Sequence, residues 1–426
     1  MTQMSCEAKS LLGRRASHVL IAAGGSGGHL TPALAMWEAW HRRSPTTRFT
    51  WITTHQPQDK QWLVGVEDAV HGLAFMPPSS WRQHPWKAWR SYQEARRQVR
   101  HVLHEDPPDV VVTFGGWPTL PVLAEARRMR LPIVLCEQNV IPGRVNRWYA
   151  SSARLIFTTY ERTRRWFPRS VPVFSVGNPV RSSFTSLGNK PMWEKVSEES
   201  RITATLSDGC DMFQPGIDGT PPRVCCKRLL VLGGSQGSRT LNAAVFSLLA
   251  RSPGLWEGWE IWHQTGWGDA VSMQEAYRKL PIRVHVLPFL SPICSFLLTA
   301  DFVISRAGGT TLAELACAGV PAILVPWRGA RDNHQLYNAR EYAHGGAAIL
   351  VEEGDQLQDT VRRLLAAVLR LKNDVQLQRN IRLRLREYAR PSAADDLVRL
   401  LCHQLQLPQT EITDEHPGRT AWALPT

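Results

Sequence analysis

Short apolar runs alternate with longer helical patterns along most of the chain. The runs fall at residues 18–23, 49–54, 109–114, 133–135 and 154–158, and again at 227–232, 260–263, 283–289, 301–305, 322–325 and 347–351. Strands separated by helical patterns are typical of a parallel sheet with crossover helices. We therefore expect an α/β fold.

Residues 187–222 interrupt this pattern, because they are rich in glycine and proline and are net acidic. Such a composition is typical of a linker that carries an unfolded insertion. A chain of 426 residues also exceeds what one hydrophobic core usually supports. We predict five segments: a polar leader (1–17), an N-terminal Rossmann-like domain (18–186), a linker with an insertion (187–226), a C-terminal Rossmann-like domain with closing helices (227–404) and a tail (405–426).

The two halves share one motif, an apolar run that ends in a Gly-Gly-Ser turn and leads into a helical pattern. Its first copy ends at residues 24–29 (Gly-Gly-Ser-Gly-Gly-His) and its second at 233–238 (Gly-Gly-Ser-Gln-Gly-Ser). A buried strand, a glycine loop and a helix N-terminus together form a common site for phosphate groups. We expect two Rossmann-like domains that face each other across a cleft and bind a nucleotide.

The first glycine loop can bring the backbone close to a ligand, because glycine has no Cβ atom. We expect Thr31 to cap the following helix and Pro32 to lie in its first turn. His29 then faces the cleft, where a histidine can act as a general base; the alternative is a tight turn with a surface histidine. A nicotinamide cofactor fits less well, because Leu30 stands where its motif needs glycine and no acid ends the run at 49–54.

A third strand, glycine turn and helix fall at residues 301–314. Thr310 and Thr311 come in the first turn of the expected helix, where amides and hydroxyls suit a diphosphate. Glu314 lies slightly deeper and can accept hydrogen bonds from ribose hydroxyls; a simple capping device is the alternative. Further along, the amides of Gln335 and Asn338 can bind sugar hydroxyls, or else belong to a polar helix start.

The charge and the tryptophan content indicate an anionic partner and an apolar boundary. The formal net charge is +13, the isoelectric point is near 9.7, and there are 17 tryptophans. Residues 81–100 hold three of these tryptophans, six basic residues and one acid. Each basic residue near an anionic membrane surface contributes about 1 kcal/mol. We predict a membrane patch made of Trp81, Arg82, Trp86, Lys87, Trp89 and Arg90.

Two other interpretations of residues 81–100 stay open. The segment can be an amphipathic helix that packs on the core and exposes a basic face, and Trp86, Trp89 and Tyr92 share a helical stripe. It can also bind single-stranded nucleic acid through stacked aromatic rings.

The eight cysteines are scattered, with no Cys-x-x-Cys pair and no zinc-type spacing with histidine. We therefore expect free thiols in a reducing compartment and no metal site. The N-terminus lacks an apolar run long enough for a signal peptide, and no stretch approaches the roughly 20 apolar residues of a transmembrane helix. These features predict a cytoplasmic protein that can lie on a membrane without crossing it.

Eight pieces of the chain together resemble the MurG family, the glycosyltransferases that convert lipid I to lipid II. The pieces occur in family order at residues 24–29, 114–117 with Pro121, 137–139, 176–181, 233–237, 263–266, 306–314 and 333–335. Each piece alone is weak, but eight in order over roughly residues 18–400 are highly specific.

The resemblance implies a GT-B fold, in which the N-terminal domain takes the lipid-linked acceptor and the C-terminal domain takes UDP-GlcNAc. It implies inverting transfer of GlcNAc to the C4 hydroxyl of MurNAc in undecaprenyl-pyrophosphoryl-MurNAc-pentapeptide (lipid I), for peptidoglycan synthesis and hence cell shape and division. It also implies a peripheral protein on the cytoplasmic face of the inner membrane, in contact with anionic phospholipid and with other cell-wall synthesis proteins. No cofactor, metal or nucleic acid is expected.

By the same resemblance, the residues that contact the donor are Ser26, Gly27, Gly28, His29, Asn139, Arg181, Ser235, Gln236, Leu290, Thr310, Thr311, Glu314, His334 and Gln335. The acceptor loop is Gly115, Gly116 and Trp117, and the catalytic base is His29, with Glu137 as the alternative. Ser26 replaces the family's threonine and keeps its hydroxyl, whereas Trp117 replaces a tyrosine and loses the phenol. Thr310 stands where a hydrophobic residue can occur, and the linker is longer than usual.

Three other functions compete with the transferase. A 2-epimerase acting on free UDP-GlcNAc would share the fold, but it would not need the tryptophan-rich basic segment. A non-catalytic scaffold that binds the sugar nucleotide would need a broken active site, which the sequence does not show. A nucleic-acid-binding protein predicts salt-sensitive binding, and the sugar-nucleotide motifs give it no support.

Overall fold

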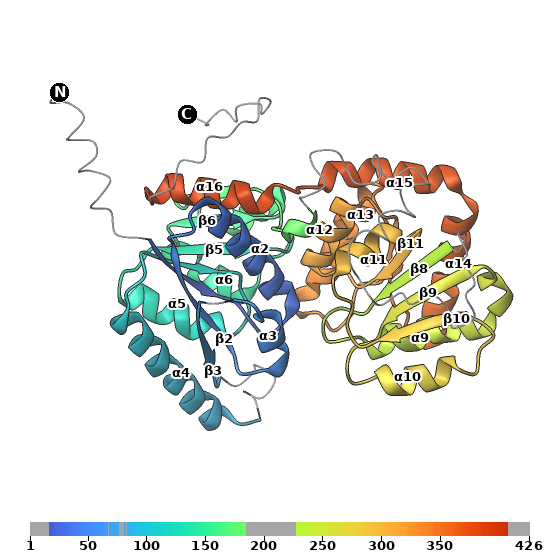
Figure 1. Cartoon of the computed structure of the whole chain (residues 1–426), viewed down its shortest axis with the longest axis horizontal. Helices are drawn as coiled ribbons and strands as arrows, with labels where there is room; N and C mark the ends of the chain where they lie inside the picture. Colours follow the sequence, from blue (N-terminus) through green and yellow to red (C-terminus); the bar gives the residue numbers. More distant parts are fainter. Residues whose placement is uncertain (1–16, 67, 76–80, 82, 185–226, 408–426) are drawn as a thin grey trace.

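The computed structural model describes residues 17–66, 68–75, 81, 83–184 and 227–407. Two parallel sheets, one in each half of the chain, are packed between helices (Figure 1). The α/β class predicted from the apolar runs is therefore confirmed. The predicted leader (except residue 17), the linker with its insertion, and most of the tail lie outside the described residues, so the predicted segment bounds stay predictions.

The N-terminal sheet has seven parallel strands in the order β3-β2-β1-β4-β5-β6-β7. The strands are β1 (His18–Ala22), β2 (Arg48–Thr54), β3 (Ala69–Leu73), β4 (Val110–Thr113), β5 (Ile133–Glu137), β6 (Leu155–Thr158) and β7 (Val173–Ser175). The helices are α2 (Gly27–Arg43), α3 (Pro57–Trp62), α4 (Pro85–Glu105), α5 (Thr119–Arg128) and α6 (Arg144–Tyr149), with short 3₁₀ turns η2 (Ala150–Ser152), η3 (Glu161–Trp166) and η4 (Ser182–Phe184).

The C-terminal sheet has six parallel strands in the order β10-β9-β8-β11-β12-β13. The strands are β8 (Lys227–Leu232), β9 (Trp259–Gln264), β10 (Arg283–Leu287), β11 (Phe302–Ser305), β12 (Ala322–Leu324) and β13 (Ile349–Leu350). The helices are α9 (Arg239–Arg251), α10 (Ala270–Tyr277), α11 (Ile293–Thr299), α12 (Gly309–Ala318), α13 (His334–His344), α14 (Leu357–Asn373), α15 (Val375–Tyr388) and α16 (Ala393–Leu405), with the turns η5 (Pro253–Trp256) and η6 (Arg331–Asn333).

Strand β1 is buried on both faces, which explains the apolar run at residues 19–22. Val19 and Ile21 pack on the face that α2 covers, whereas Leu20 and Ala22 pack on the face that α4 and α5 cover. Successive side chains of a strand point to opposite faces, so one short run supplies two hydrophobic layers.

The last helix returns to the N-terminal half of the molecule. Figure 1 shows α15 over the C-terminal sheet and α16 beside α2. Leu397 and Leu401 of α16 are buried in the same cluster as Leu34 and Met36 of α2. The chain therefore crosses between the two halves a second time, after α15.

A buried histidine stabilises the C-terminal sheet in its neutral form. His263 is the residue before the last in β9, and its Nε2 lies 3.1 Å from the Asn242 side-chain oxygen, which can only accept a hydrogen bond. Nε2 therefore carries the proton, and Nδ1 accepts from the Tyr277 hydroxyl at 2.9 Å. Burial lowers the pKa of His263 to about 3.

This shift predicts that the protein loses stability in mild acid. Below pH 6.5 an unfolded chain protonates this histidine while the folded chain does not, so the free energy of unfolding falls as the pH drops towards 3. The slope for one proton is about 1.4 kcal/mol per pH unit. Urea unfolding at pH 7, 6 and 5 should show a shallower pH slope for His263→Gln than for the wild type. His403→Gln, at an exposed position on α16, is the control; equal slopes for all three proteins would contradict the prediction.

Candidate functional site

The carboxyl ends of the middle strands carry the glycine loops in both sheets. In each sheet the strand order reverses beside the first strand, between β1 and β4 and between β8 and β11. Ligands of open parallel sheets bind in the crevice at such a reversal. Residues 24–28 follow β1 and 114–117 follow β4, while 233–238 follow β8 and 306–308 follow β11. The expected motifs therefore line the two crevices.

Helix α2 begins inside the first glycine loop, which corrects the expectation that Thr31 caps it. Ser26 is at the N-cap and Gly27 is the first helical residue, so Pro32 lies within the helix instead of in its first turn. Because Pro32 has no N–H, the carbonyl of Gly28 lacks its intrahelical donor. Thr310 of the C-terminal half supplies that donor through its hydroxyl, at 3.0 Å.

The two Gly-Gly-Ser loops touch each other. The Gly27 amide donates to the Ser235 hydroxyl at 3.3 Å, and the Gln236 side-chain amide donates to the Gly25 carbonyl at 3.2 Å. A Cβ atom on Gly27 would lie 3.1 Å from the Cβ of Ser235, which is closer than side-chain carbons normally approach. Loops 208 residues apart in sequence thus form one surface.

His29 lies in the first turn of α2, against the loop that follows β4. Its Nδ1 is 2.8 Å from the Phe114 carbonyl oxygen, so Nδ1 donates and Nε2 is left to accept a proton. A Cβ on Gly116 would lie 3.1 Å from the ring, so this close approach needs glycine. Burial lowers the pKa of His29, while the charge of Glu137 and the Phe114 hydrogen bond act in the opposite direction. The imidazole is therefore neutral at pH 7.

Glu137, the alternative base, holds a loop together. Its carboxylate is buried and accepts four hydrogen bonds, two from the backbone and side-chain amides of Asn139 at 3.0 Å, one from the Gly143 amide at 2.9 Å and one from the Asn146 side chain at 2.8 Å. Two oxygens with two donors each leave little room for a further proton.

An amide pair joins the two halves beside this loop. The Asn338 side chain donates to the Asn139 side-chain oxygen at 2.9 Å and accepts from the Val140 backbone at the same distance. Asn338 is fully buried. Its amide, which the sequence places among candidates for sugar hydroxyls, is therefore engaged in protein contacts.

The loop after β4, which the resemblance assigns to the acceptor, needs glycine for its conformation. Gly115 and Gly116 have φ angles of +82° and +88°, a region that other residues rarely adopt. The Trp117 ring lies 5.1 Å from Phe75, and a Cβ on Gly25 would lie 3.0 Å from the indole nitrogen. The loop after β4 and the loop after β1 therefore pack directly on each other.

Helix α12 places its polar residues as the sequence predicts. Thr310 and Thr311 lie in the first turn, and Glu314 lies in the second turn and is buried. Burial raises the pKa of Glu314 to about 8, although Arg181 acts in the opposite direction. Glu314 is therefore mostly protonated at pH 7. Arg181 itself forms an ion pair with Glu38 of α2 at 2.6 Å.

Leu290, His334 and Gln335 lie around the carboxyl end of the C-terminal sheet. The buried Leu290 donates its amide to the Gln264 side chain at 3.1 Å. His334 Nδ1 lies 2.8 Å from the Arg331 carbonyl, and the Gln335 side-chain oxygen accepts from the Trp327 amide at 3.0 Å. The His334 and Gln335 side chains are thus oriented by the segment that follows β12.

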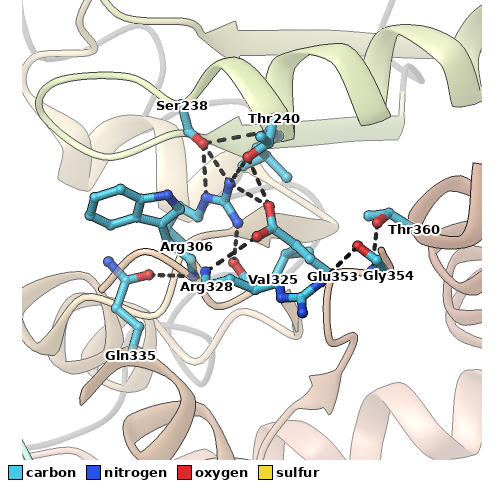
Figure 2. A network of polar contacts seen from close by, with 11 residues as sticks. Ser238, Thr240, Arg306, Val325, Arg328, Gln335, Glu353, Gly354 and Thr360 are labelled. Carbon is cyan, nitrogen blue, oxygen red and sulfur yellow. Dashed lines mark hydrogen bonds and ion pairs between the residues drawn. The ribbon is translucent and has the colours of Figure 1, made fainter. Parts of the chain in front are cut away.

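Two sets of site residues carry no local signal in the sequence. Asp332 accepts from Arg144 at 2.8 Å and from Arg147 at 2.7 Å, which ties the start of α13 to the N-terminal half. Arg306 and Glu353 form a buried ion pair at the centre of a polar network (Figure 2). Arg306 belongs to a motif that the sequence shows, but its partner is 47 residues away.

Helix α4 exposes only part of the predicted membrane patch. Trp86 and Trp89 are 78% and 56% exposed and lie edge to face, and Lys87 and Arg90 are also exposed. Trp81 is half-buried and packs on Phe75. Arg82 lies outside the described residues. Across the part of the chain that the structure describes, no helix is both long and apolar enough to span a bilayer.

The rest of residues 81–100 follows the alternative interpretation, a helix packed on the core. Tyr92 contacts Phe75, and Arg96 and Arg100 pair with the buried carboxylate of Glu125 at 2.6 and 2.9 Å. The apolar and basic residues of this segment are thus divided between the core and the surface. Among the described residues, no three His, Cys, Asp or Glu side chains gather as a metal site.

Comparison with known proteins agrees with this geometry. Residues 19–158 match the glycosyltransferase family 28 N-terminal domain, and residues 228–387 match the glycosyltransferase family 28 C-terminal domain. A UDP-N-acetylglucosamine–N-acetylmuramyl-(pentapeptide) pyrophosphoryl-undecaprenol N-acetylglucosamine transferase from Desulfotalea psychrophila is 32% identical over 395 residues, covering 92% of this chain and 97% of that protein.

Solved structures show the same architecture. The crystal structure of Acinetobacter baumannii MurG aligns with a TM-score of 0.65 at 23% identity, covering 91% of this chain and 100% of that one. A UDP-GlcNAc 2-epimerase from Neisseria meningitidis, bound to UDP-GlcNAc, aligns with a TM-score of 0.62 at 14% identity over 91% and 100% of the two chains. At such identities the likeness shows the fold, which is GT-B. With the family models and the 32% identical relative, it places the chain in the MurG family of glycosyltransferases.

Proposed function

We propose that this protein transfers GlcNAc from UDP-GlcNAc to the C4 hydroxyl of MurNAc in lipid I and so forms lipid II. The observation that carries the proposal is the contact between the two Gly-Gly-Ser loops, with His29 beside it. A donor held by one loop and an acceptor held by the other would meet at this contact. The proximity of two bound reactants is itself a large part of catalysis.

The C-terminal half is suited to the donor. Helices α9 and α12 both begin at the crevice of its sheet, and the unpaired amides of a helix N-terminus favour a diphosphate. Ser235, in the loop before α9, and Thr311, in the first turn of α12, add hydroxyl groups, whereas the Thr310 hydroxyl already donates to the Gly28 carbonyl. The same amides can stabilise the charge that develops on the leaving UDP.

His29 is better placed than Glu137 to remove the proton from the attacking hydroxyl. Its Nε2 is the nitrogen that can accept a proton, and burial keeps the ring neutral. All four accepting positions of the Glu137 carboxylate are occupied by amides. Glu137 instead supplies negative charge near the imidazolium that forms during transfer.

The exposed part of α4 is suited to an anionic membrane surface. Trp86 and Trp89 offer two large apolar rings, and Lys87 and Arg90 flank them with positive charge. This arrangement supports a peripheral protein on the cytoplasmic face of the inner membrane, where lipid I and the other cell-wall synthesis proteins would be reached.

The transferase function predicts acceptor-dependent release of UDP. The wild type should release UDP from UDP-GlcNAc only with a lipid I analogue present and should form a β-1,4-linked disaccharide. His29→Gln should lower turnover about 10²–10⁴-fold, the usual contribution of a general base, with the donor KM nearly unchanged. His104→Gln, at an exposed position on α4, is the control. Release of UDP without acceptor would indicate the epimerase or a hydrolase, and donor binding without turnover would indicate a scaffold.

The membrane patch predicts a loss of vesicle binding when its rings are removed. Burial of a large apolar side chain contributes about 1.5–3 kcal/mol, so Trp86→Ala with Trp89→Ala should weaken binding at least tenfold. Cosedimentation with phosphatidylglycerol vesicles measures this. Trp267→Ala removes a comparably exposed ring from the other half and should bind as the wild type does. Equal binding by all three proteins would place the membrane surface elsewhere.

The raised pKa of Glu314 predicts weaker donor binding in alkali. Below about pH 8 the carboxyl is neutral, and above it a buried negative charge appears one turn after Thr310 and Thr311, close to the proposed diphosphate site. The wild type should therefore lose affinity for UDP between pH 7 and 9, whereas Glu314→Gln should lose much less. Calorimetric titration at both pH values measures this. Equal losses of affinity in both proteins would show that the ionisation of Glu314 does not weaken UDP binding.

A further inference from the structure

The buried ion pair of Arg306 and Glu353 has no part in the donor contacts described so far. Arg306 Nη2 lies 2.8 Å from Glu353 Oε1, and the two side chains are 5% and 9% exposed (Figure 2). A buried pair at this depth is stabilising only when further hydrogen bonds satisfy both groups. Both groups form such further hydrogen bonds here. Their partners lie at the end of the 233–238 loop and in the 327–335 segment, which frame the proposed donor site.

Arg306 closes the glycine loop of the C-terminal half. Its backbone amide donates to the Leu232 carbonyl at 3.1 Å, where the loop leaves β8. Its guanidinium donates to the Ser238 hydroxyl at 3.0 Å and 2.5 Å and to the Thr240 hydroxyl at 2.5 Å, where the loop enters α9. A further N–H bonds to the Val325 carbonyl at 2.9 Å. One residue therefore holds both ends of the loop that carries Ser235.

Glu353 connects Arg306 to the second loop. Its Oε1 also accepts from the Thr240 hydroxyl at 2.8 Å, and its Oε2 accepts from the Arg328 backbone amide at 3.2 Å. The preceding amide, that of Trp327, donates to Gln335. The carboxylate thus connects the glycine loop, through Arg306, to the backbone at residues 327–328, which in turn holds the Gln335 side chain.

We propose that Glu353 is a positioning residue for the donor. It holds the Arg306 guanidinium in the orientation that fixes the glycine loop, and it holds the 327–335 segment at a set distance from that loop. Ser235 and Gln335 then keep the spacing that the two ends of a sugar nucleotide require. The nature of the ligand in this inference rests on the proposed function.

The environment of Glu353 favours positioning over direct contact with a ligand. Three donors already use its carboxylate, which is nearly buried. A carboxylate would also repel a diphosphate. Small displacements of groups that hold a substrate can lower activity strongly, so a residue without ligand contact can still control affinity.

Glu353→Gln tests the proposal with little change of shape. The new amide keeps one oxygen for Arg306, but it sets an N–H against the Arg328 N–H and so breaks the connection to the second loop. Calorimetric affinity for UDP should fall about tenfold, and the KM for UDP-GlcNAc should rise similarly. The acceptor KM, and kcat at saturating donor, should stay within threefold. Glu352→Gln is the matched control, since Glu352 is exposed and pairs only with the exposed Arg340 in the described network.

A second variant covers the case in which Glu353→Gln does not fold. Thr240→Val removes the hydroxyl between Arg306 and Glu353 from an exposed position at the start of α9, and UDP affinity should again fall. Wild-type protein that binds no UDP would contradict the proposed function itself. Wild-type protein that binds UDP, with folded variants that bind it equally well, would overturn the positioning role even if their melting temperatures were lower.

Discussion

The contact between the two halves of this molecule centres on the carbonyl oxygen of Gly28. Pro32 lies four residues further along α2 and has no N–H, so this carbonyl has no hydrogen-bond donor within the helix. The Thr310 hydroxyl bonds to it from the first turn of α12, 282 residues away. Together with the contact of Gly27 and Ser235, this bond brings two helix N-termini of opposite halves to the same place. We propose that the reaction takes place there.

The groups around this contact fall into two kinds. Backbone amides and small hydroxyls form the surface of the crevices, as a site for a diphosphate requires. Charged and amide side chains lie behind them and have their hydrogen-bond partners: the buried Glu137, Arg306 and Asn338 and the nearly buried Glu353. Buried polar networks of this kind fix a single geometry, because any loosened member would leave unpaired groups away from water. Rigid loops can then present their amides without reorganisation.

Much of this arrangement can be predicted from the sequence, for local reasons. The glycine turns need residues without a Cβ, so Gly27 and Gly116 mark close approaches that the structure confirms. The apolar runs predict the strands, because central parallel strands are buried on both faces. The start of α2 was predicted wrongly, because Pro32 usually marks a first helical turn, and here a partner from the other half compensates for its missing donor.

The remainder depends on contacts between distant residues. Glu353 belongs to no recognisable motif. It meets Arg306 only because β11 and β13, which precede the two residues, lie in the same sheet. The return of α16 to the N-terminal half likewise has no local signal, since an apolar helix face does not by itself show which core it packs on. In residues 81–100, the periodicity alone does not show that Tyr92 packs on the core while Trp86 and Trp89 are exposed.

A crystal structure with UDP-GlcNAc bound would test the central claim most directly. We expect the diphosphate to accept hydrogen bonds at the starts of α9 and α12, beside Ser235 and Thr311, with the sugar towards Gln335 and its anomeric carbon facing the His29 side of the cleft. A diphosphate bound instead to the loop at residues 24–28, with the loops of the C-terminal half unoccupied, would contradict the account.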